Sequence, residues 1–237
     1  KKKRIASELV YISAILLLLF AKNLMELANF FFQAEDGIRD RSPSRGLGVV
    51  YKRQLIDYAE TMEGVKAFMG SKYVQARMAT AYADAKRFLT EGRKVLFSGT
   101  PCQLAGRHHF LRKPYDNLLS VDIICHGTPS PKVCGMYLDE VVTAGRKAIN
   151  DVQFRNKRNG WKAFNFTMEY NKDEQSVSLC SHHQQNHFMR AFLRDMILRP
   201  SCYRCQAKIG RSHSDITIAD FWGIQTIFPE MWILIPI

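Results

Sequence analysis

Four cysteines occupy positions where thiol chemistry would be useful. Cys102 lies in the turn sequence FSGTPCQLAG, and Cys125 follows the apolar run LLSVDII. Cys202 and Cys205 form a C-x-x-C loop, a spacing that lets two thiolates bind one metal centre. Zinc and a 4Fe-4S cluster both accept four sulfur ligands in a tetrahedral arrangement. The residues alone therefore leave three readings open: an iron-sulfur site, a structural zinc site, or unrelated thiols.

The remaining cysteines are expected to have structural roles. Cys134 falls on the apolar face of an expected helix, and Cys180 falls in an expected strand, so both are predicted to be small core residues. The sequence shows no credible secretory signal, which argues against a disulfide framework and favours a cytoplasmic protein. Metal binding or redox work is thus the expected use of the other four.

The spacing of apolar residues predicts the elements that must position these thiols. Helices are expected at 74–90, 101–111, 129–145 and 186–198, and strands at 93–98, 118–125, 149–155, 161–170, 177–180 and 215–220. Thr100 is suited to cap the second helix, with Pro101 at its first position. The alternation of strands and helices favours a parallel sheet, whose neighbouring carboxyl ends would place Cys102 and Cys125 at one edge.

The expected fold class is α/β, with α+β character in the second half. The prediction is a mixed sheet with flanking helices and an antiparallel hairpin region around Asn159-Gly160. The chain has 237 residues and a formal charge of +12, but its basic residues are spread along the whole length without an interleaved aromatic stripe. We therefore expect no nucleic-acid partner.

Both ends of the chain differ from the rest. Lys1–Arg4 precede an apolar run from Val10 to Ala21, which is shorter than the ~20 residues of a membrane span, so no stable membrane anchor is expected. Residues 30–54 show neither a helical nor a strand period and resemble a translation of sequencing-adapter DNA. Residues 1–54 are predicted to be non-native, 55–226 to form a truncated domain, and 227–237 to be a non-native or truncated tail.

Five ordered segments carry a family resemblance. They are GSKYVQ at 70–75, LFSGTPCQLAG at 96–106, VDIICHGTPSPKV at 121–133, RPSCYRCQAK at 199–208 and SDITIADFWGI at 214–224. Together they resemble the coenzyme F420 hydrogenase/dehydrogenase beta-subunit family, of the bacterial kind. The resemblance covers residues 55–226.

This resemblance implies an iron-sulfur flavoprotein oxidoreductase, although the fragment alone need not be active. In such proteins a flavin passes electrons between 4Fe-4S centres and a hydride donor or acceptor of the coenzyme F420 or nicotinamide type. The implied cofactors are a 4Fe-4S cluster and FAD, with coenzyme F420 as a candidate substrate. The implied partners are a redox partner protein or ferredoxin-like domain and a small-molecule hydride donor. The alternative is a non-catalytic α/β module with a structural zinc site held by four cysteines.

The resemblance also implies that Cys102, Cys125, Cys202 and Cys205 ligate the cluster. Other candidates follow from their position in the sequence. His126, beside Cys125, is a candidate hydrogen-bond donor to a cluster sulfide. The mechanism needs no general base, so no catalytic residue is assigned. The residues expected to bind the flavin or another anionic cofactor are Ser71, Lys72, Tyr73, Ser98, Gly99, Thr100, Asp220 and Gly223.

Overall fold

The computed structural model describes residues 28–34, 55–61, 64–65, 68, 70–142, 149–160, 163–172, 175–220 and 223–227. The chain divides into two compact units. Of the described residues, the first unit contains 28–31, Tyr82–Cys125, 206–220 and 223–227, and the second contains those from Phe32 to Ala81 and from His126 to Cys205. From Tyr82 onwards the chain runs through the first unit, leaves it after Cys125, and returns to it after Cys205.

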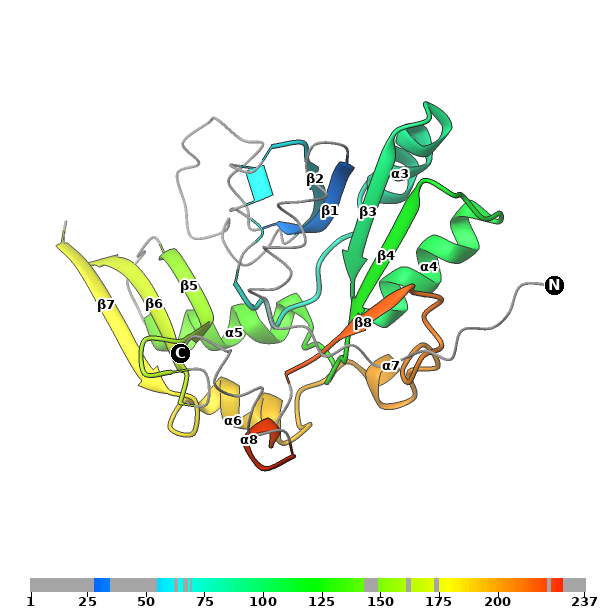
Figure 1. Ribbon diagram of the computed structural model, residues 1–237. Coiled ribbons are helices and arrows are strands. Elements are labelled where there is room, and N and C mark those ends of the chain that lie inside the picture. The colour runs from blue at the N-terminus through cyan, green and yellow to red at the C-terminus, as the bar shows by residue number, and fades with distance from the viewer. Residues whose placement is uncertain are drawn as a thin grey trace. The chain divides into compact units, whose positions relative to one another are not determined.

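The first unit is built on a parallel sheet. Strands β1 (Ala28–Ala34), β3 (Lys94–Gly99), β4 (Leu118–Ile123) and β8 (Ile216–Ile218) lie in the order β1-β3-β4-β8, and every neighbouring pair is parallel. Helix α3 (Ala81–Thr90) precedes β3, and helix α4 (Pro101–Leu111) makes the crossover from β3 to β4 (Figure 1). Parallel neighbours need such a crossover, and the helix supplies it.

Local signals explain why α4 begins and ends where it does. Thr100 has the extended backbone of an N-cap, and Pro101 occupies the first helical turn. The Gln103 side chain accepts the Thr100 N–H at 2.8 Å, which satisfies one of the donors left over at a helix start. At the other end, Arg112 has a left-handed backbone and donates its N–H to the His108 carbonyl. The predicted helix 101–111 and its cap are confirmed.

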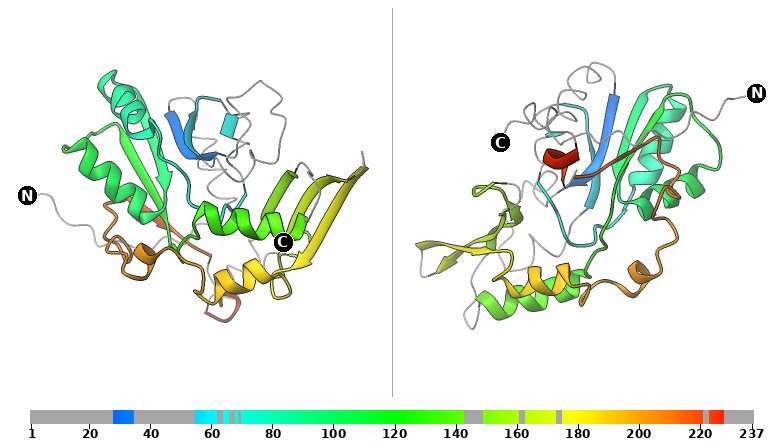
Figure 2. Two further views of the ribbon diagram at one scale, coloured as in Figure 1. Left: turned by 180° about the vertical axis from the view of Figure 1, so that it is seen from behind. Right: turned by 60° about the horizontal axis from the view of Figure 1, so that its bottom comes forward.

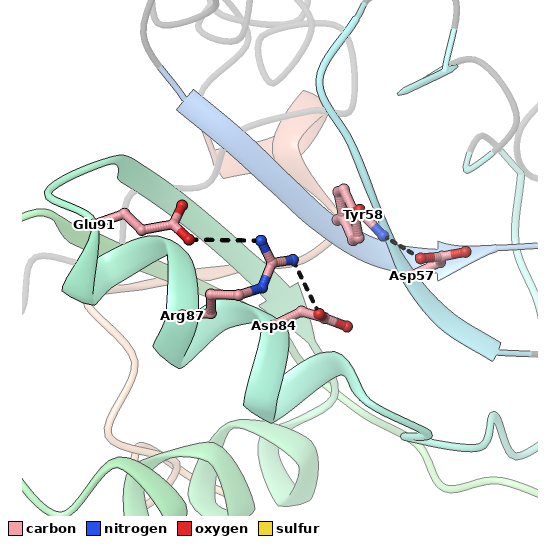
Figure 3. A network of polar contacts seen from close by, with 5 residues as sticks. All are labelled: Asp57, Tyr58, Asp84, Arg87 and Glu91. Carbon is pink, nitrogen blue, oxygen red and sulfur yellow. Dashed lines mark hydrogen bonds and ion pairs between the residues drawn. The ribbon is translucent and has the colours of Figure 1, made fainter.

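The polar contacts on α3 and on β2 (Leu55–Ala59) are local. On α3, Arg87 lies 3.1 Å from Asp84 and 3.6 Å from Glu91, at i,i+3 and i,i+4 spacing (Figure 3). On β2, the Tyr58 N–H donates to the Asp57 carboxylate at 2.9 Å (Figure 3). Exposed pairs of the α3 kind stabilise a helix by about 0.3–0.5 kcal/mol each. They support their own elements and do not determine the fold.

The second unit has an antiparallel sheet of its own. Its strands β5 (Ile149–Asn156), β6 (Asn165–Lys172) and β7 (Gln175–His182) lie in the order β5-β6-β7. Helices α5 (Pro131–Val142) and α6 (His187–Leu193) lie close to this sheet, and the four-residue α7 (Pro200–Tyr203) follows α6 (Figure 2). One buried cluster joins both helices to the sheet; it includes Leu138, Phe154, Phe166, Met168 and Phe188.

The two sheets and their helices confirm the expected α/β class with an antiparallel region. The expected helix at 74–90 is too long, because α3 begins only at Ala81. Val74 is fully buried in the core of the second unit, and Ala79 has a positive φ of 42°, which is incompatible with a continuous helix. The helix expected at 186–198 ends at Leu193, shortly before Asp195 at φ 60°.

Part of the N-terminal segment is a strand. Residues 30–54 show no strand period, yet Phe30 and Phe31 belong to β1 and pair with Leu96 and Phe97 of β3. Residues 1–27, 35–54 and 228–237 lie outside the described residues, so the assignment of both ends as non-native remains a prediction. Within the described part of the chain, no helix has the length and apolar character needed to cross a membrane.

Candidate functional site

Cys102 is an exposed thiol at the start of α4. Its sulfur lies 3.3 Å from the Thr100 hydroxyl, at the helix end that carries a partial positive charge. Tyr82 lies nearby, and its hydroxyl donates to the Gln103 carbonyl at 2.7 Å. Burial, and then the negative charge of a Cys102 thiolate, raise the pKa of Tyr82 to about 12. Tyr82 is therefore a neutral hydrogen-bond donor beside the thiol.

Cys125 follows the strand next to the one that precedes Cys102. Strands β3 and β4 are parallel, with Gly99 in register with Asp122. Cys102 and Cys125 each lie three residues beyond this pair, Cys102 in α4 and Cys125 in the turn after β4. The prediction that both thiols follow the carboxyl ends of neighbouring parallel strands is confirmed.

The turn that follows Cys125 contacts the late cysteine loop. The Arg199 N–H donates to the Thr128 carbonyl at 3.0 Å, and Pro129 forms a bridge with Leu198. The Cys202 sulfur lies 3.9 Å from the same Thr128 carbonyl and 4.0 Å from the Thr128 hydroxyl. Backbone pairing therefore attaches α7, which carries Cys202, to the segment next to Cys125 in the chain.

Gly127 makes this contact sterically possible. A Cβ atom at Gly127 would lie 2.8 Å from a methyl carbon of Leu198 and 3.4 Å from the Cβ of Cys202. Its φ of 142° is also one that residues with side chains rarely adopt. The turn and the cysteine helix approach this closely because the residue between them is glycine.

Asp195 engages residues on both sides of this contact. Its carboxylate lies 2.8 Å from Nε2 of His126, which is also 3.1 Å from the Phe192 carbonyl. The Asp195 carbonyl accepts a hydrogen bond from the Tyr203 hydroxyl, within the C-x-x-C segment. His126 Nε2 thus contacts Asp195 and Phe192, whereas the expected role was donation to a sulfide. Asp195 had no distinguishing signal in the sequence.

The four predicted ligands are divided between the units. Cys102 and Cys125 belong to the first, and Cys202 and Cys205 to the second. None of these thiols is in a disulfide, so the chemistry of the donor set fits a zinc ion or an iron-sulfur cluster. Among the described residues, no three His, Cys, Asp or Glu side chains are grouped closely enough to hold one metal ion. The four-cysteine set remains a prediction.

Of the other two cysteines, one is buried and one is exposed. Cys134 is completely buried in the core of the second unit, and burial raises its pKa to about 12, as expected of an inert core thiol. Cys180 is exposed, so its predicted core role is wrong. Leu179 on β7 packs against the core, and successive residues of a strand point to opposite faces.

In the turn expected to bind a flavin phosphate, the Gln103 side chain of α4 fills the space beside the backbone. A Cβ atom at Gly99 would lie 2.9 Å from the Gln103 side-chain oxygen and 3.2 Å from Leu104. The Thr100 N–H is bonded to that same oxygen, and Ser98 is buried. An anion at this turn would have to displace Gln103, so phosphate binding by Ser98, Gly99 and Thr100 stays a prediction.

Two of the predicted cofactor residues before α3, Lys72 and Tyr73, make contacts within the protein. The Lys72 ammonium group lies 3.1 Å from the Phe68 carbonyl and 3.4 Å from that of Gly70, closing its own loop. Tyr73 stacks on Phe192, with ring centroids 4.9 Å apart, and packs against the core of the second unit. These contacts give Lys72 and Tyr73 structural roles in addition to any in binding.

The remaining predicted cofactor residues make few described contacts. Ser71 is half-buried and belongs to the second unit, whereas Asp220 and Gly223 belong to the first. Asp220 is exposed, and no atom of the described residues lies within 4 Å of the position a Gly223 Cβ would take. Trp222, between them, lies outside the described residues. Their role in cofactor binding is untested.

More than half of the chain matches the model of one known protein family. Residues 92–233, more than half of the sequence, match the family model for the C terminus of the coenzyme F420 hydrogenase/dehydrogenase beta subunit. The chain belongs to this family. The expected resemblance is thereby confirmed, and the chain is an oxidoreductase subunit of the F420 hydrogenase/dehydrogenase beta type. No curated protein matches the chain.

The family match covers the cysteines but not every predicted site residue. It begins at Gly92 and therefore includes Cys102, Cys125, Cys202 and Cys205, whereas Ser71–Tyr73 lie before it. The name beta subunit implies that members of this F420 hydrogenase/dehydrogenase family work with partner subunits.

Arg107 is a polar residue that the sequence analysis overlooked. It is only 3% exposed and lies on the buried side of α4 with Leu104 and Leu111. These three positions follow the i, i+3, i+7 spacing of an apolar helix face. An arginine within that spacing was the available signal, because a buried cation needs polar partners.

Proposed function

We propose that this F420 hydrogenase/dehydrogenase family member passes electrons between an iron-sulfur centre and a hydride donor or acceptor of the coenzyme F420 or nicotinamide type. Cys102, Cys125, Cys202 and Cys205 are the proposed ligands of a 4Fe-4S cluster. The observation that carries the proposal is the backbone pairing of α7 with the turn after Cys125, which brings Cys202 against Thr128. FAD is the proposed second cofactor.

Residues around the four cysteines would help to hold such a cluster, some by electrostatic attraction and some by leaving room for the thiols to approach. When bound, the flavin supplies two-electron hydride exchange and the cluster supplies one-electron transfer. The N-terminus of α4 carries a partial positive charge that suits an anionic cluster, and the Thr100 hydroxyl can donate to the Cys102 sulfur. Gly127 permits the approach of Cys202, while Asp195 engages His126 and Tyr203 on either side of it.

The proposed flavin contacts come from three short segments. Ser98, Gly99 and Thr100 precede α4, Ser71, Lys72 and Tyr73 precede α3, and Asp220 and Gly223 follow β8. Hydroxyl and ammonium groups would bind the phosphates, and glycine would allow a planar ring to approach closely. The proposed partners are a redox subunit or ferredoxin-like domain and a small-molecule hydride donor. Unoxidised thiols of this kind suit a reducing cytoplasm.

Substitution of single cysteines tests this proposal. We expect Cys102→Ser, Cys125→Ser, Cys202→Ser and Cys205→Ser each to reduce bound iron and visible absorption severalfold in anaerobically purified full chain. The matched control is Cys180→Ser, because Cys180 is an exposed thiol, like Cys102, but lies on β7, outside the proposed set. Equal iron content in all five variants and the parent would overturn the ligand assignment. Zinc in place of iron would support the structural zinc module.

A further inference from the structure

A basic recess lies in the first unit, away from the cysteine-bearing turns. It has a volume of about 380 Å³ and is formed by the end of α4, the loop 112–115, the start of β4 and residues 213 and 215. Asp215 supplies a carboxylate to its wall. The basic side chains that line the recess are Arg107, His108, His109, Arg112, Lys113 and His213. Positive groups therefore outnumber negative ones.

The Arg107 guanidinium group at this recess is buried, and its hydrogen bonds go to neutral groups. One terminal nitrogen donates to the Ser120 hydroxyl, and the other lies 3.4 Å from the His213 carbonyl. Among the described residues, its Nε has no hydrogen-bond partner. The nearby Asp215 carboxylate instead accepts the Ser120 N–H at 2.7 Å. Burial lowers the pKa of Arg107, and the nearby Asp215 carboxylate offsets this only in part. The positive charge of Arg107 is therefore incompletely balanced.

Two histidines of the recess form a stacked pair. The rings of His108 and His213 stack with centroids 4.1 Å apart and planes 9° from parallel. Partial burial, followed by the charges of His213, His109 and Arg107, lowers the pKa of His108. Both rings line the recess together with Arg107.

The recess is distinct from the proposed cluster site. It lies where α4 ends and β4 begins, whereas Cys102 lies where α4 begins and Cys125 follows β4. The 11 residues of α4 correspond to roughly 16 Å of helix. The carboxyl end of α4 carries a partial negative charge that opposes anion binding, but the effect is small compared with several full positive charges.

We propose that this recess binds the phosphate group of a small molecule. Donors on α4, on the following loop and at His213 approach from several directions, which suits a tetrahedral phosphate better than a planar carboxylate. The volume exceeds that of one phosphate ion and leaves room for an attached group. Arg112 and Lys113 supply exposed positive charge, and Arg107 supplies a buried one. The proposal does not depend on the cysteine cluster.

Calorimetric titration of the full chain tests the proposal. The ligands are inorganic phosphate, ribose 5-phosphate and neutral ribose, at fixed ionic strength. The test variant is Arg112→Asn/Lys113→Gln, since asparagine tolerates the positive φ of residue 112. The matched control is Lys132→Gln/Lys157→Gln, which removes two exposed positive charges from the second unit. His213→Asn, at another positive φ, is a second test variant.

We expect inorganic phosphate to bind, ribose not to bind, and both test variants to weaken phosphate binding at least about tenfold. The control should match the parent protein. Tighter binding of ribose 5-phosphate than of inorganic phosphate would identify a phosphate ester as the source, and equal binding would identify free phosphate. Absence of phosphate binding, or equal binding by test and control variants, would overturn the proposal. Iron measured in the same samples keeps this outcome separate from that of the cluster proposal.

Discussion

At the scale of single residues, Tyr82 controls the space beside the first turn of α4. A Cβ atom at Gly106 would lie 2.6 Å from the Tyr82 hydroxyl, which is held by its bond to the Gln103 carbonyl. The Tyr82 ring also packs against Phe97 and Phe110, so it cannot move aside easily. Gly106 therefore sits inside a helix despite its low helix propensity.

Gly106→Ala is expected to lower the free energy of unfolding by about 1–3 kcal/mol, because the overpacking outweighs the gain in helix propensity. In a Tyr82→Phe background, the hydroxyl is absent, and the same change should be neutral or stabilise by up to about 1 kcal/mol. Urea denaturation of the four proteins in this double-mutant cycle measures the difference. Equal effects in both backgrounds would show that the hydroxyl is not the obstacle.

The raised pKa of Tyr82 makes a prediction at alkaline pH. The unfolded chain releases the phenol proton near pH 10, whereas the folded chain holds it to about pH 12. Between these values the unfolded state binds fewer protons, so stability falls as pH rises. Relative to Tyr82→Phe, the parent protein should lose stability between pH 10 and 12 and show no such loss below pH 9. A constant difference from pH 9 to 12 would contradict this.

At the scale of elements, the turn 126–128 and α7 form the contact on which the proposed function depends. Gly127→Ala is expected to destabilise the protein by about 2 kcal/mol or more beyond the effect of Gly160→Ala. Both glycines have positive φ, but among the described residues only a Cβ at Gly127 would meet other atoms, those of Leu198 and Cys202. Thermal or urea denaturation of the two variants separates steric contact from backbone strain. Equal losses would mean that the close approach is unimportant.

Elements with local signals were predictable from the sequence. The start of α4 depends on Thr100, Pro101 and Gln103, which are neighbours in the chain, and its position was predicted correctly. The start of α3 was not, because Val74 has the spacing of a helical face but is buried in the core of the other unit. Its apolar character serves a tertiary contact that periodicity cannot reveal.

The candidate site was predictable only in part. The parallel arrangement of β3 and β4 followed from the strand-helix-strand pattern, and with it the placement of Cys102 and Cys125 after neighbouring strands. Cys180 was wrongly predicted to be in the core, because it directly follows the core-facing Leu179 and successive strand residues point to opposite faces. The role of Asp195 arises from a contact with His126, far away in the chain, which no spacing in the sequence records. The helical spacing of Arg107 with Leu104 and Leu111 indicated that it is buried but not that it contacts His213.

At the scale of the whole molecule, the last two passages of the described chain between its units fall at cysteines. Cys125 is the last residue before the chain leaves the first unit, and Cys205 is the last before it returns. Periodicity within each element gives no indication of this division. A metal centre that binds these thiols only in the folded state would stabilise the folded chain, because its binding energy becomes folding energy.

Metal and sulfide analysis of the full chain, purified anaerobically, tests the central claim most directly. The proposed function predicts about four iron and four sulfide atoms per chain, broad visible absorption near ~400 nm and little zinc. Stoichiometric zinc without iron or colour would contradict it and would favour a structural role for the four thiols.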